Sequence, residues 1–388
     1  MTQSTRRVLI AGGGIGGLAL ANQLCRSGVP VTVFERASEL REIGAAIGVQ
    51  TNAVKALRGM GLDEALVAEG VTLDNYEYVD WKGRRLARWS QAEVARRLGA
   101  PTVVVHRGDL QRVLLSTLPA DVLRLGQAVE RFEQDGDGVT ARLADGTDVR
   151  GAVLVGCDGL QSVVRAGLLD DGPPRYSGWV AFRGIAPAYA HPSLSPGDAR
   201  QTLGRGCSFG TWHIPRGVYW VGTVRRPAGA GEPAEGRKRH LLDRFASAHQ
   251  PIADVIESTG DPDVLRHEVY DRPPVTSWSR GRVALLGDAA HPTTPVTGQG
   301  GGQAIIDAAV LGEALADADL GDAGAVSRAF AAYQRRREPV TSEITTEAWR
   351  IARMHHFSHP AACAARDLSL KLTPTRVWDK RMLTRLSH

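Results

Sequence analysis

The chain has 388 residues, of which 43% are hydrophobic and 23% charged, and its formal net charge is +5. This length is too great for one small core, so we expect two closely joined domains. No apolar run approaches the roughly 20 residues of a membrane-spanning helix, and no basic tract with interleaved aromatic residues indicates nucleic-acid binding. The four scattered cysteines form no C-x-x-C pair. This predicts neither a disulfide framework nor a metal site, and with the absence of an N-terminal apolar leader it favours the cytoplasm.

The first element predicts a strand, a tight turn and a helix. The apolar strand Val8–Ala11 runs into a glycine cluster in which Gly12, Gly14 and Gly17 fit the G-x-G-x-x-G spacing. The first glycine permits the turn, the second lets backbone approach a pyrophosphate, and the third lets the helix pack on the strand. A second apolar strand ends on Glu35, about 20 residues further on, where a ribose hydroxyl needs an acceptor. Because the whole unit is in register, a dinucleotide site is favoured over a purely structural turn.

The next elements alternate between helices and strands. We predict helices over residues 52–60, 110–118 and 161–168, the second with Asp109 as its N-cap. Strands are predicted over residues 76–81, 103–107 and 153–155, and a hairpin around Ala144-Asp145-Gly146.

From Pro173 helical periodicity fades, and aromatic-rich alternating runs predict a second, antiparallel sheet. These runs cover residues 179–183, 208–214 and 218–221, and five of the eight tryptophans lie between Trp81 and Trp220. Aromatic residues favour strands in any β core, so this could be simple packing. The alternative is the wall of an apolar small-molecule pocket.

The α/β pattern then returns. A buried strand over residues 281–288 ends on Asp288, and the glycine run 298–303 opens a helix over residues 304–316. A further helix is predicted from Val326 past Arg337, ending near Pro339 and resuming over residues 341–354. The tail from His355 is basic and helical in parts, and no function is assigned to it.

Three signatures now stand in order along residues 6–340: the glycine turn with Glu35, Cys157-Asp158-Gly159, and Gly287-Asp288-Ala289-Ala290-His291-Pro292 followed by Pro295-Val296-Thr297-Gly298-Gln299-Gly300. Together they resemble the single-component FAD-dependent aromatic monooxygenases, the para-hydroxybenzoate hydroxylase-like flavoproteins, and especially their salicylate-, 3-hydroxybenzoate- and urate-hydroxylase-like members.

The resemblance implies an α/β fold in which a Rossmann-type FAD-binding domain is interleaved with an antiparallel-sheet substrate domain, followed by C-terminal helices. The FAD-binding domain would comprise residues 1–72, 101–172 and 276–340. The substrate domain would comprise residues 73–100 and 173–275, and the helical region residues 341–388.

The same resemblance assigns residues to the cofactor. It places Asp158 and the nearby Arg165 in a segment that the family uses for both FAD and NAD(P)H. Asp158 could otherwise be only a helix cap, and Arg165 a solvated helix residue. The glycines after Asp288 would face the flavin pyrimidine edge or form a flexible hinge. The residues expected to bind FAD are Gly12, Gly14, Ile15, Gly16, Gly17, Glu35, Arg36, Arg41, Arg107, Val129, Asp158, Asp288, Gly298, Gly300, Gly301 and Gly302.

In this family NADPH or NADH reduces the flavin transiently, O2 adds to give a flavin hydroperoxide, and oxygen passes to an electron-rich aromatic or enolic small molecule. His213 is the candidate base, because histidine titrates near neutrality, although a strand histidine can equally be structural. Gln299 could assist it, and His291 is read as structural. Trp179, Arg183, Trp212 and Tyr219 are the candidate substrate-binding residues.

Two other functions remain open. Flavin-dependent halogenases share this fold and carry a W-x-W-x-I-P stretch. Here Trp212-His213-Ile214-Pro215 matches its second half, but Gly210 replaces the first tryptophan and the family's lysine has no clear match. The second alternative is a non-catalytic FAD-binding sensor.

Overall fold

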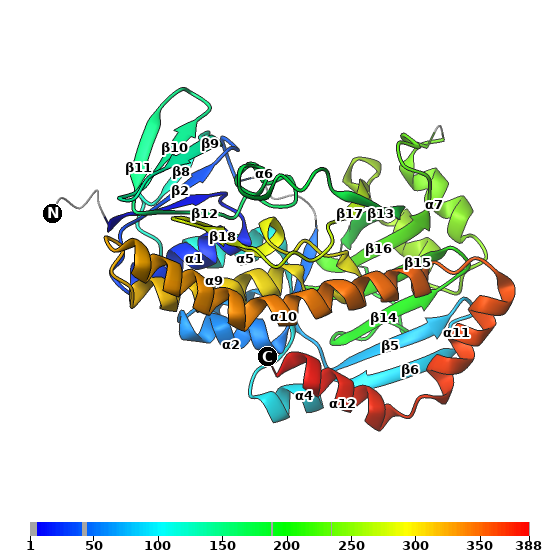
Figure 1. Ribbon diagram of the computed structural model, residues 1–388. Coiled ribbons are helices and arrows are strands. Elements are labelled where there is room, and N and C mark those ends of the chain that lie inside the picture. The colour runs from blue at the N-terminus through cyan, green and yellow to red at the C-terminus, as the bar shows by residue number, and fades with distance from the viewer. Residues whose placement is uncertain (1–5, 41–44, 188, 234, 388) are drawn as a thin grey trace.

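The computed structural model describes residues 6–40, 45–187, 189–233 and 235–387. A six-stranded sheet lies at one end of the molecule (Figure 1), with strand order β18-β19-β12-β1-β2-β8. All of its pairings are parallel except β18 with β19. The six strands are β1 (Val8–Ala11), β2 (Val31–Glu35), β8 (Leu123–Leu125), β12 (Val153–Gly156), β18 (Ser279–Arg280) and β19 (Val283–Leu285).

The first βαβ unit has the predicted form. Helix α1 (Ile15–Arg26) follows β1 directly, ends at Ser27-Gly28, and packs against β1, β2 and the later helix α9 (Gly300–Ala316). The β1 side chains are fully buried, as expected for a parallel strand covered on both faces. The carboxyl ends of β1, β2 and β12 therefore meet at one edge, where α/β proteins place their ligands.

A seven-stranded sheet forms the other half of the molecule, in the order β17-β13-β16-β15-β14-β5-β6. Its pairings are antiparallel except for β14 with β5. This confirms the predicted second sheet. Its strands are β5 (Asn75–Asp80), β6 (Arg85–Ser90), β13 (Arg175–Pro187), β14 (Asp198–Leu203), β15 (Cys207–Ile214), β16 (Gly217–Arg225) and β17 (Leu265–Asp271).

The two faces of this sheet differ in what covers them. Phe182, Phe209 and Trp220 on one face form a core with helices α7 (Arg237–Phe245) and α8 (Ile252–Glu257). Because side chains alternate along a strand, their neighbours point to the opposite face, toward the parallel sheet. That opposite face lines a large cavity.

Two small sheets and several short helices complete the fold. One sheet has the order β11 (Asp148–Gly151), β10 (Val139–Leu143), β9 (Val129–Gln134). The other has the order β3 (Ala46–Val49), β7 (Val103–His106), β4 (Val71–Thr72). The remaining α-helices before α9 are α2 (Thr51–Gly59), α3 (Asp63–Glu69), α4 (Gln91–Leu98), α5 (Arg107–Leu115) and α6 (Val163–Leu169), and the 3-10 turns are η2 (Asp261–Asp263), η3 (Gly287–Ala289) and η4 (Pro295–Thr297).

The start of α5 differs from the prediction. The helix begins at Arg107, and the Nδ1 atom of His106 accepts a hydrogen bond from the Gly108 N–H at 3.2 Å. Asp109 is buried inside the first turn and pairs with Arg216 at 2.6 Å. The expectation that Asp109 caps this helix is therefore wrong, because a tertiary ion pair holds its carboxylate.

The predicted break at Pro339 is also wrong. Helix α10 (Ala323–His355) runs without interruption through this proline and crosses both halves of the molecule (Figure 1). Proline removes one backbone donor, and the Thr341 hydroxyl donates to the Arg337 carbonyl at 3.1 Å in the next turn. Helices α11 (Pro360–Leu372) and α12 (Thr375–Leu386) then fold back against β6. Within the described ranges, no helix is both long and apolar enough to cross a membrane.

Candidate active site

One cavity of about 2090 Å³ runs from the edge of the parallel sheet to the open face of the seven-stranded sheet. Small-molecule pockets commonly enclose roughly 300–1,000 Å³, so this one has room for more than one ligand. It is lined by the first glycine loop, Glu35, the start of α9 and the aromatic strands, which joins most of the predicted site residues in one space.

The glycine loop shows what each glycine does. Gly12 has φ +106°, and a Cβ there would lie 2.4 Å from the Cys157 carbonyl oxygen. A Cβ at Gly17 would lie 2.0 Å from the Gly12 oxygen, so Gly17 lets α1 pack on the loop and does not line the cavity. Gly14 is different, because its φ of −75° is ordinary and a Cβ would meet no atom within 4 Å. The space beside Gly14 therefore belongs to the cavity, where Ile15 and Gly16 also lie.

Glu35 stands at the end of β2 as predicted and lines the cavity. Its carboxylate accepts hydrogen bonds from the Gly13 N–H at 2.8 Å and the Ala37 N–H at 2.9 Å, which fix it beside the loop. Arg36 and Val129 line the same end of the cavity. Arg41 lies outside the described residues.

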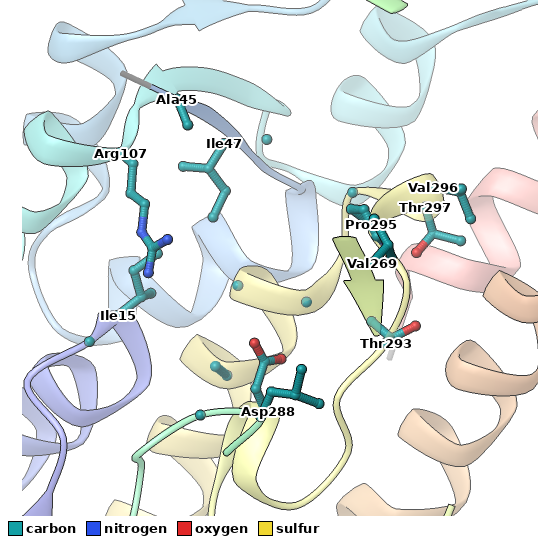
Figure 2. A pocket seen from close by; sticks show the side chains of 18 of the residues that line it. Ile15, Ala45, Ile47, Arg107, Val269, Asp288, Thr293, Pro295, Val296 and Thr297 are labelled. Atoms are coloured by element: carbon teal, nitrogen blue, oxygen red, sulfur yellow. The ribbon is translucent and has the colours of Figure 1, made fainter. Parts of the chain in front are cut away.

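Arg107 and Asp288 enter the central part of the cavity from different elements (Figure 2). Arg107 begins α5, and Asp288 lies in η3, directly after the buried strand β19. Asp288 is open to the cavity but enclosed by surrounding protein, so burial raises the pKa of its carboxyl, while the charges of His291 and Arg107 act in the opposite direction. Between them, Arg107 can donate hydrogen bonds to an acidic group and Asp288 can accept one from a hydroxyl group.

Asp158 caps a helix and also lines the cavity. Its Oδ2 atom accepts from the Val163 N–H at 2.8 Å and the Val164 N–H at 3.2 Å, which caps α6. Its Oδ1 atom is buried with no hydrogen-bond partner in the described chain, and the residue lines the cavity. Burial raises the pKa of this carboxyl. An orphaned buried oxygen at a cavity wall is the expected mark of a missing ligand.

Arg165 is a buried structural residue, which excludes the solvated alternative. It pairs with Asp171 and donates to the carbonyls of Ala289 at 2.9 Å and Ala290 at 2.8 Å. These carbonyls directly follow Asp288, so Arg165 positions the turn that carries it.

The glycine run starts α9 at Gly300, with no side-chain cap and no acidic residue in the first turn. The first N–H groups of an uncapped helix carry partial positive charge and lack partners. Gly298, Gly300 and Gly301 line the cavity, whereas Gly302 packs near Ala53 outside it. The start of α9 lies close to that of α1, because a Cβ at Gly16 would be 3.2 Å from the Ala304 Cβ. Two uncapped helix N-termini therefore meet at one cavity, which is a strong anion site.

A buried polar network supports this arrangement from behind. Asp307 accepts from Arg337 at 2.7 Å and from the Gly287 N–H at 3.1 Å, and its Oδ2 lies 2.5 Å from the His291 Nε2. Burial would raise the Asp307 pKa, but His291 and Arg337 outweigh it and lower the pKa to about 2. His291 thus has the structural position expected of it. Gln299 is buried beside this network and outside the cavity lining, its Oε1 accepting from Gln303 at 3.1 Å.

The candidate substrate residues lie together on the open face of the seven-stranded sheet. Trp179, Arg183, Trp212 and Tyr219 all line the cavity. Trp212 is paired across the strands with Tyr219, and their rings are 5.8 Å apart. Burial raises the Tyr219 pKa, and the charge of Arg183 partly opposes this. Arg183 forms no ion pair in the part of the chain that the structure describes, and its Nε is buried without a partner.

His213 does not lie with them. It occupies the strand position after Trp212, so it points to the opposite face, and its Nε2 bonds the Leu194 carbonyl at 3.1 Å. It is absent from the cavity lining. The expectation that His213 faces the substrate is wrong, because strand alternation turns it away.

The far wall of the cavity was not predicted from the sequence. Tyr78, His355 and Trp378 line it, from β5 and from the C-terminal helices to which no function was assigned. His355 lies 3.3 Å from the Tyr78 hydroxyl, and its burial lowers its pKa to about 3. Its ring is therefore neutral at physiological pH.

These features fit FAD. The open space at Gly14, the free helix N-termini, Glu35 and the orphaned Asp158 oxygen provide what a dinucleotide needs, and the remaining cavity continues beyond it to the aromatic sheet. Fold and site together define a flavoprotein of the monooxygenase class.

Comparisons with known proteins agree. A family model described as FAD binding domain matches residues 5–348. The chain is 38% identical over 380 residues to the aurachin C monooxygenase/isomerase of Stigmatella aurantiaca, covering 96% of each chain, and 36% identical to the 3-amino-4-hydroxybenzoate 2-monooxygenase of Streptomyces cremeus, covering 95% and 92%. The crystal structure of Klebsiella pneumoniae HpxO complexed with FAD and uric acid superposes with a TM-score of 0.92 at 29% identity, covering 99% and 97%.

The chain therefore belongs to the FAD binding domain family, and it is an FAD-dependent, hydroxylating monooxygenase.

Proposed function

We propose that this enzyme uses NADPH or NADH and O2 to hydroxylate an electron-rich aromatic or enolic small molecule that binds as an anion. The observation that carries the proposal is the continuous cavity, which joins the nucleotide-binding loop to the aromatic face around Arg183. The names of the relatives support it, because they include an aminohydroxybenzoate monooxygenase and a structure with uric acid bound.

FAD, when bound, supplies the redox chemistry, accepting a hydride from NAD(P)H and activating O2. The residues of the chain hold and polarise it. Gly14 and the start of α1 would hold the pyrophosphate, and Glu35 the adenosine ribose. Asp288 and Arg107 would bind nearer the flavin, while the uncapped start of α9 favours negative charge on whatever lies against it.

NAD(P)H would bind only transiently in the same cavity. The sequence contains one G-x-G-x-x-G turn followed by a strand and an acid, and that turn faces the FAD end. The cavity volume of about 2090 Å³ leaves room for a second ligand beside FAD.

Arg183 would hold the substrate in its anionic form. A half-buried guanidinium without an ion pair is costly unless an anion meets it, and its wall is otherwise made of Trp179, Trp212 and Tyr219. A cation beside a phenol or enol lowers the pKa of its hydroxyl and makes the ring more nucleophilic. This gives Arg183 the substrate-activating task that His213 cannot reach.

The halogenase alternative is not favoured. A Cβ at Gly210 would lie 2.3 Å from the Trp212 ring, because the two residues are on the same face of β15. The first tryptophan of W-x-W therefore has no space here. A non-catalytic sensor would not require a chamber for a second ligand beside the flavin site.

The test is NAD(P)H oxidation by the FAD-loaded enzyme with a panel of phenols, hydroxybenzoates and purines. We expect oxidation to accelerate with a subset of them and to yield a product heavier by one oxygen atom. Arg183→Met should raise KM for an anionic ring at least tenfold, with Arg183→Lys less affected. Halogenated product in the presence of bromide, or no acceleration by any ring compound, would overturn the proposal.

We also propose that the enzyme acts in the cytoplasm. The cysteines are free thiols, which fits a reducing compartment. Fractionation of the native host would test this.

A further inference from the structure

The lining of the cavity continues past the substrate wall to the edge of the seven-stranded sheet. We call this part of the cavity the annex and define it by Tyr76, Tyr78, Trp89, Leu370, Trp378 and Met382, which all line it. They come from β5, β6, α11 and α12. The C-terminal helices thus form one wall of the annex, and α11 and α12 both contact β6.

The annex has an ordered aromatic lining. The rings of Tyr76 and Trp89 stack 4.7 Å apart, with an angle of 16° between their planes, and Trp89 stacks on Trp378 at 5.5 Å and 20°. The ring centre of Tyr78 lies 5.7 Å from that of Trp89. Because rings held by their neighbours lose little entropy on binding, such a wall suits a flat apolar ligand.

Polar groups without partners lie along the way from the substrate wall to the annex. Gln201 is 8% exposed and lines the cavity beside Tyr78, its cross-strand neighbour, and its side chain has no hydrogen bond in the described chain. Gln91 is 7% exposed, also lines the cavity, and its Oε1 is buried without a partner. A buried amide oxygen is normally hydrogen-bonded, so the Gln91 Oε1 atom indicates a ligand with a polar atom in this passage.

We propose that the annex binds the remote part of the substrate, a flat aromatic or polyunsaturated group attached to the ring that is hydroxylated. This rests on the proposed function, because the reacting ring must lie at Arg183 and Trp212. The linking portion carries a polar atom, such as a carbonyl oxygen or ring nitrogen, that meets the amide of Gln201. The natural substrate is accordingly an extended molecule with at least two rigid parts and not a single small ring.

The test compares phenol with 4-phenylphenol, which adds one flat ring, by equilibrium dialysis against the FAD-loaded protein. We expect the wild-type protein to bind 4-phenylphenol at least about tenfold more tightly than phenol. An advantage smaller than about twofold would overturn the annex as a binding site.

A filling variant, a trimming variant and one control show where the second ring of 4-phenylphenol binds. Leu370→Trp fills the annex, and Leu372→Trp is its matched control, because Leu372 lies on the same helix and is 69% exposed. We expect Leu370→Trp to abolish the preference for 4-phenylphenol while phenol affinity stays within about twofold, and Leu372→Trp to change neither. Trp378→Leu, at a half-buried site, should weaken 4-phenylphenol binding about tenfold without creating an overpacked core.

Failure here is distinguishable from failure of the proposed function. If 4-phenylphenol has no advantage but ring compounds still accelerate NAD(P)H oxidation, the annex is wrong and hydroxylation stands. If both filling and trimming variants bind 4-phenylphenol as the wild type does, the annex is also wrong, because the second ring then binds elsewhere. Loss of the advantage in both variants supports the annex whether or not the probe is hydroxylated.

Discussion

At the residue scale, Gly14 separates a structural need for glycine from a functional one. Its backbone is extended, with φ −75° and ψ −175°, and a Cβ there would contact no protein atom within 4 Å. An alanine is therefore tolerated by the fold, but it would occupy the space in which we propose that the FAD pyrophosphate binds. We expect Gly14→Ala to change the free energy of unfolding of the apoprotein by less than about 0.5 kcal/mol and to weaken FAD binding at least about tenfold.

The measurement is an FAD titration followed by flavin fluorescence, together with urea unfolding of the apoprotein. Gly59→Ala is the matched control, because a Cβ at Gly59 also meets nothing and the residue ends α2 away from the cavity. Equal FAD affinities for wild type and Gly14→Ala would show that the pyrophosphate does not bind at this loop.

Asp307 gives a prediction for pH. Its folded pKa is about 2, below the ordinary value of 3.8, because burial is outweighed by His291 and Arg337. The unfolded chain therefore takes up a proton near pH 4 and the folded chain only near pH 2. This stabilisation is complete above about pH 4 and is lost as the pH falls toward 2, on the order of 2 kcal/mol.

Asp307→Asn should lower the free energy of unfolding at pH 7 by about 3 kcal/mol, because it leaves the Arg337 charge buried without its partner. The difference from wild type, measured by urea unfolding, should shrink between pH 4 and pH 2. The double variant Asp307→Asn/Arg337→Met should recover part of the loss. A difference that stays constant with pH would show that Asp307 is not the titrating group.

The sequence predicted where side chains at strand ends lie better than which way side chains within a strand point, for a physical reason. Glycines and acids at the ends of buried strands have fixed directions once the βαβ unit is recognised, and Glu35 and Asp288 both lie at strand ends that open on the cavity. On a strand, a shift of one residue reverses the side chain. His213 and Trp212 were both plausible from the sequence, and only the register of β15 against β16 decides that Trp212 faces the cavity.

At the scale of elements, α10 shows how tertiary packing overrides a local signal. Pro339 is exposed within a continuous helix of 33 residues, while Phe330, Tyr333 and Ile344 on its other side are buried. The proline therefore costs hydrogen bonding without contributing to packing. We expect Pro339→Ala to raise the free energy of unfolding by about 1–3 kcal/mol, measured by urea denaturation.

Pro173→Ala provides the comparison, because Pro173 is exposed and lies outside the helices and strands. Replacing this proline increases the conformational entropy of the unfolded chain, so the free energy of unfolding should fall by up to about 1 kcal/mol. Loss of stability in Pro339→Ala would mean that the helix needs the proline's shape at this point.

The elements that the sequence did not predict are those whose pattern is ambiguous or remote. Strand β14 has mixed polarity, and its position in the sheet depends on parallel pairing with β5, more than a hundred residues earlier. The contribution of α11 and α12 to the annex was equally hidden. Their apolar side chains show amphipathic helices, but nothing local says which sheet edge they cover.

At the scale of the whole molecule, the chain passes repeatedly between its two sheets. β1 and β2 lie in the parallel sheet, β5 and β6 in the antiparallel one, β12 returns to the first and β13 to the second. Helix α10 is joined to α9 by the ion pair of Arg337 with Asp307, and at its end it carries His355, which reaches Tyr78 of β5. Because these crossings join both halves to one cavity, we expect the two halves to unfold as one cooperative unit.

That cooperativity can be tested through the cofactor. A ligand that binds only the folded chain adds about 2.7 kcal/mol of stability when its concentration is 100 times its Kd. When FAD is added to the apoprotein at that concentration, thermal unfolding should remain a single transition and its midpoint temperature should rise. The same rise should be seen by far-ultraviolet circular dichroism and by tryptophan fluorescence. Most tryptophans lie in the antiparallel half, so their signal reports on the part of the molecule farthest from the glycine loop. Riboflavin lacks the pyrophosphate and adenosine that we propose Gly14 and Glu35 bind, so it should produce little shift at the same concentration. The opposite result would be two transitions, with FAD raising the midpoint temperature only of the one that circular dichroism detects and tryptophan fluorescence does not. The two halves would then unfold independently despite their shared helix and shared cavity.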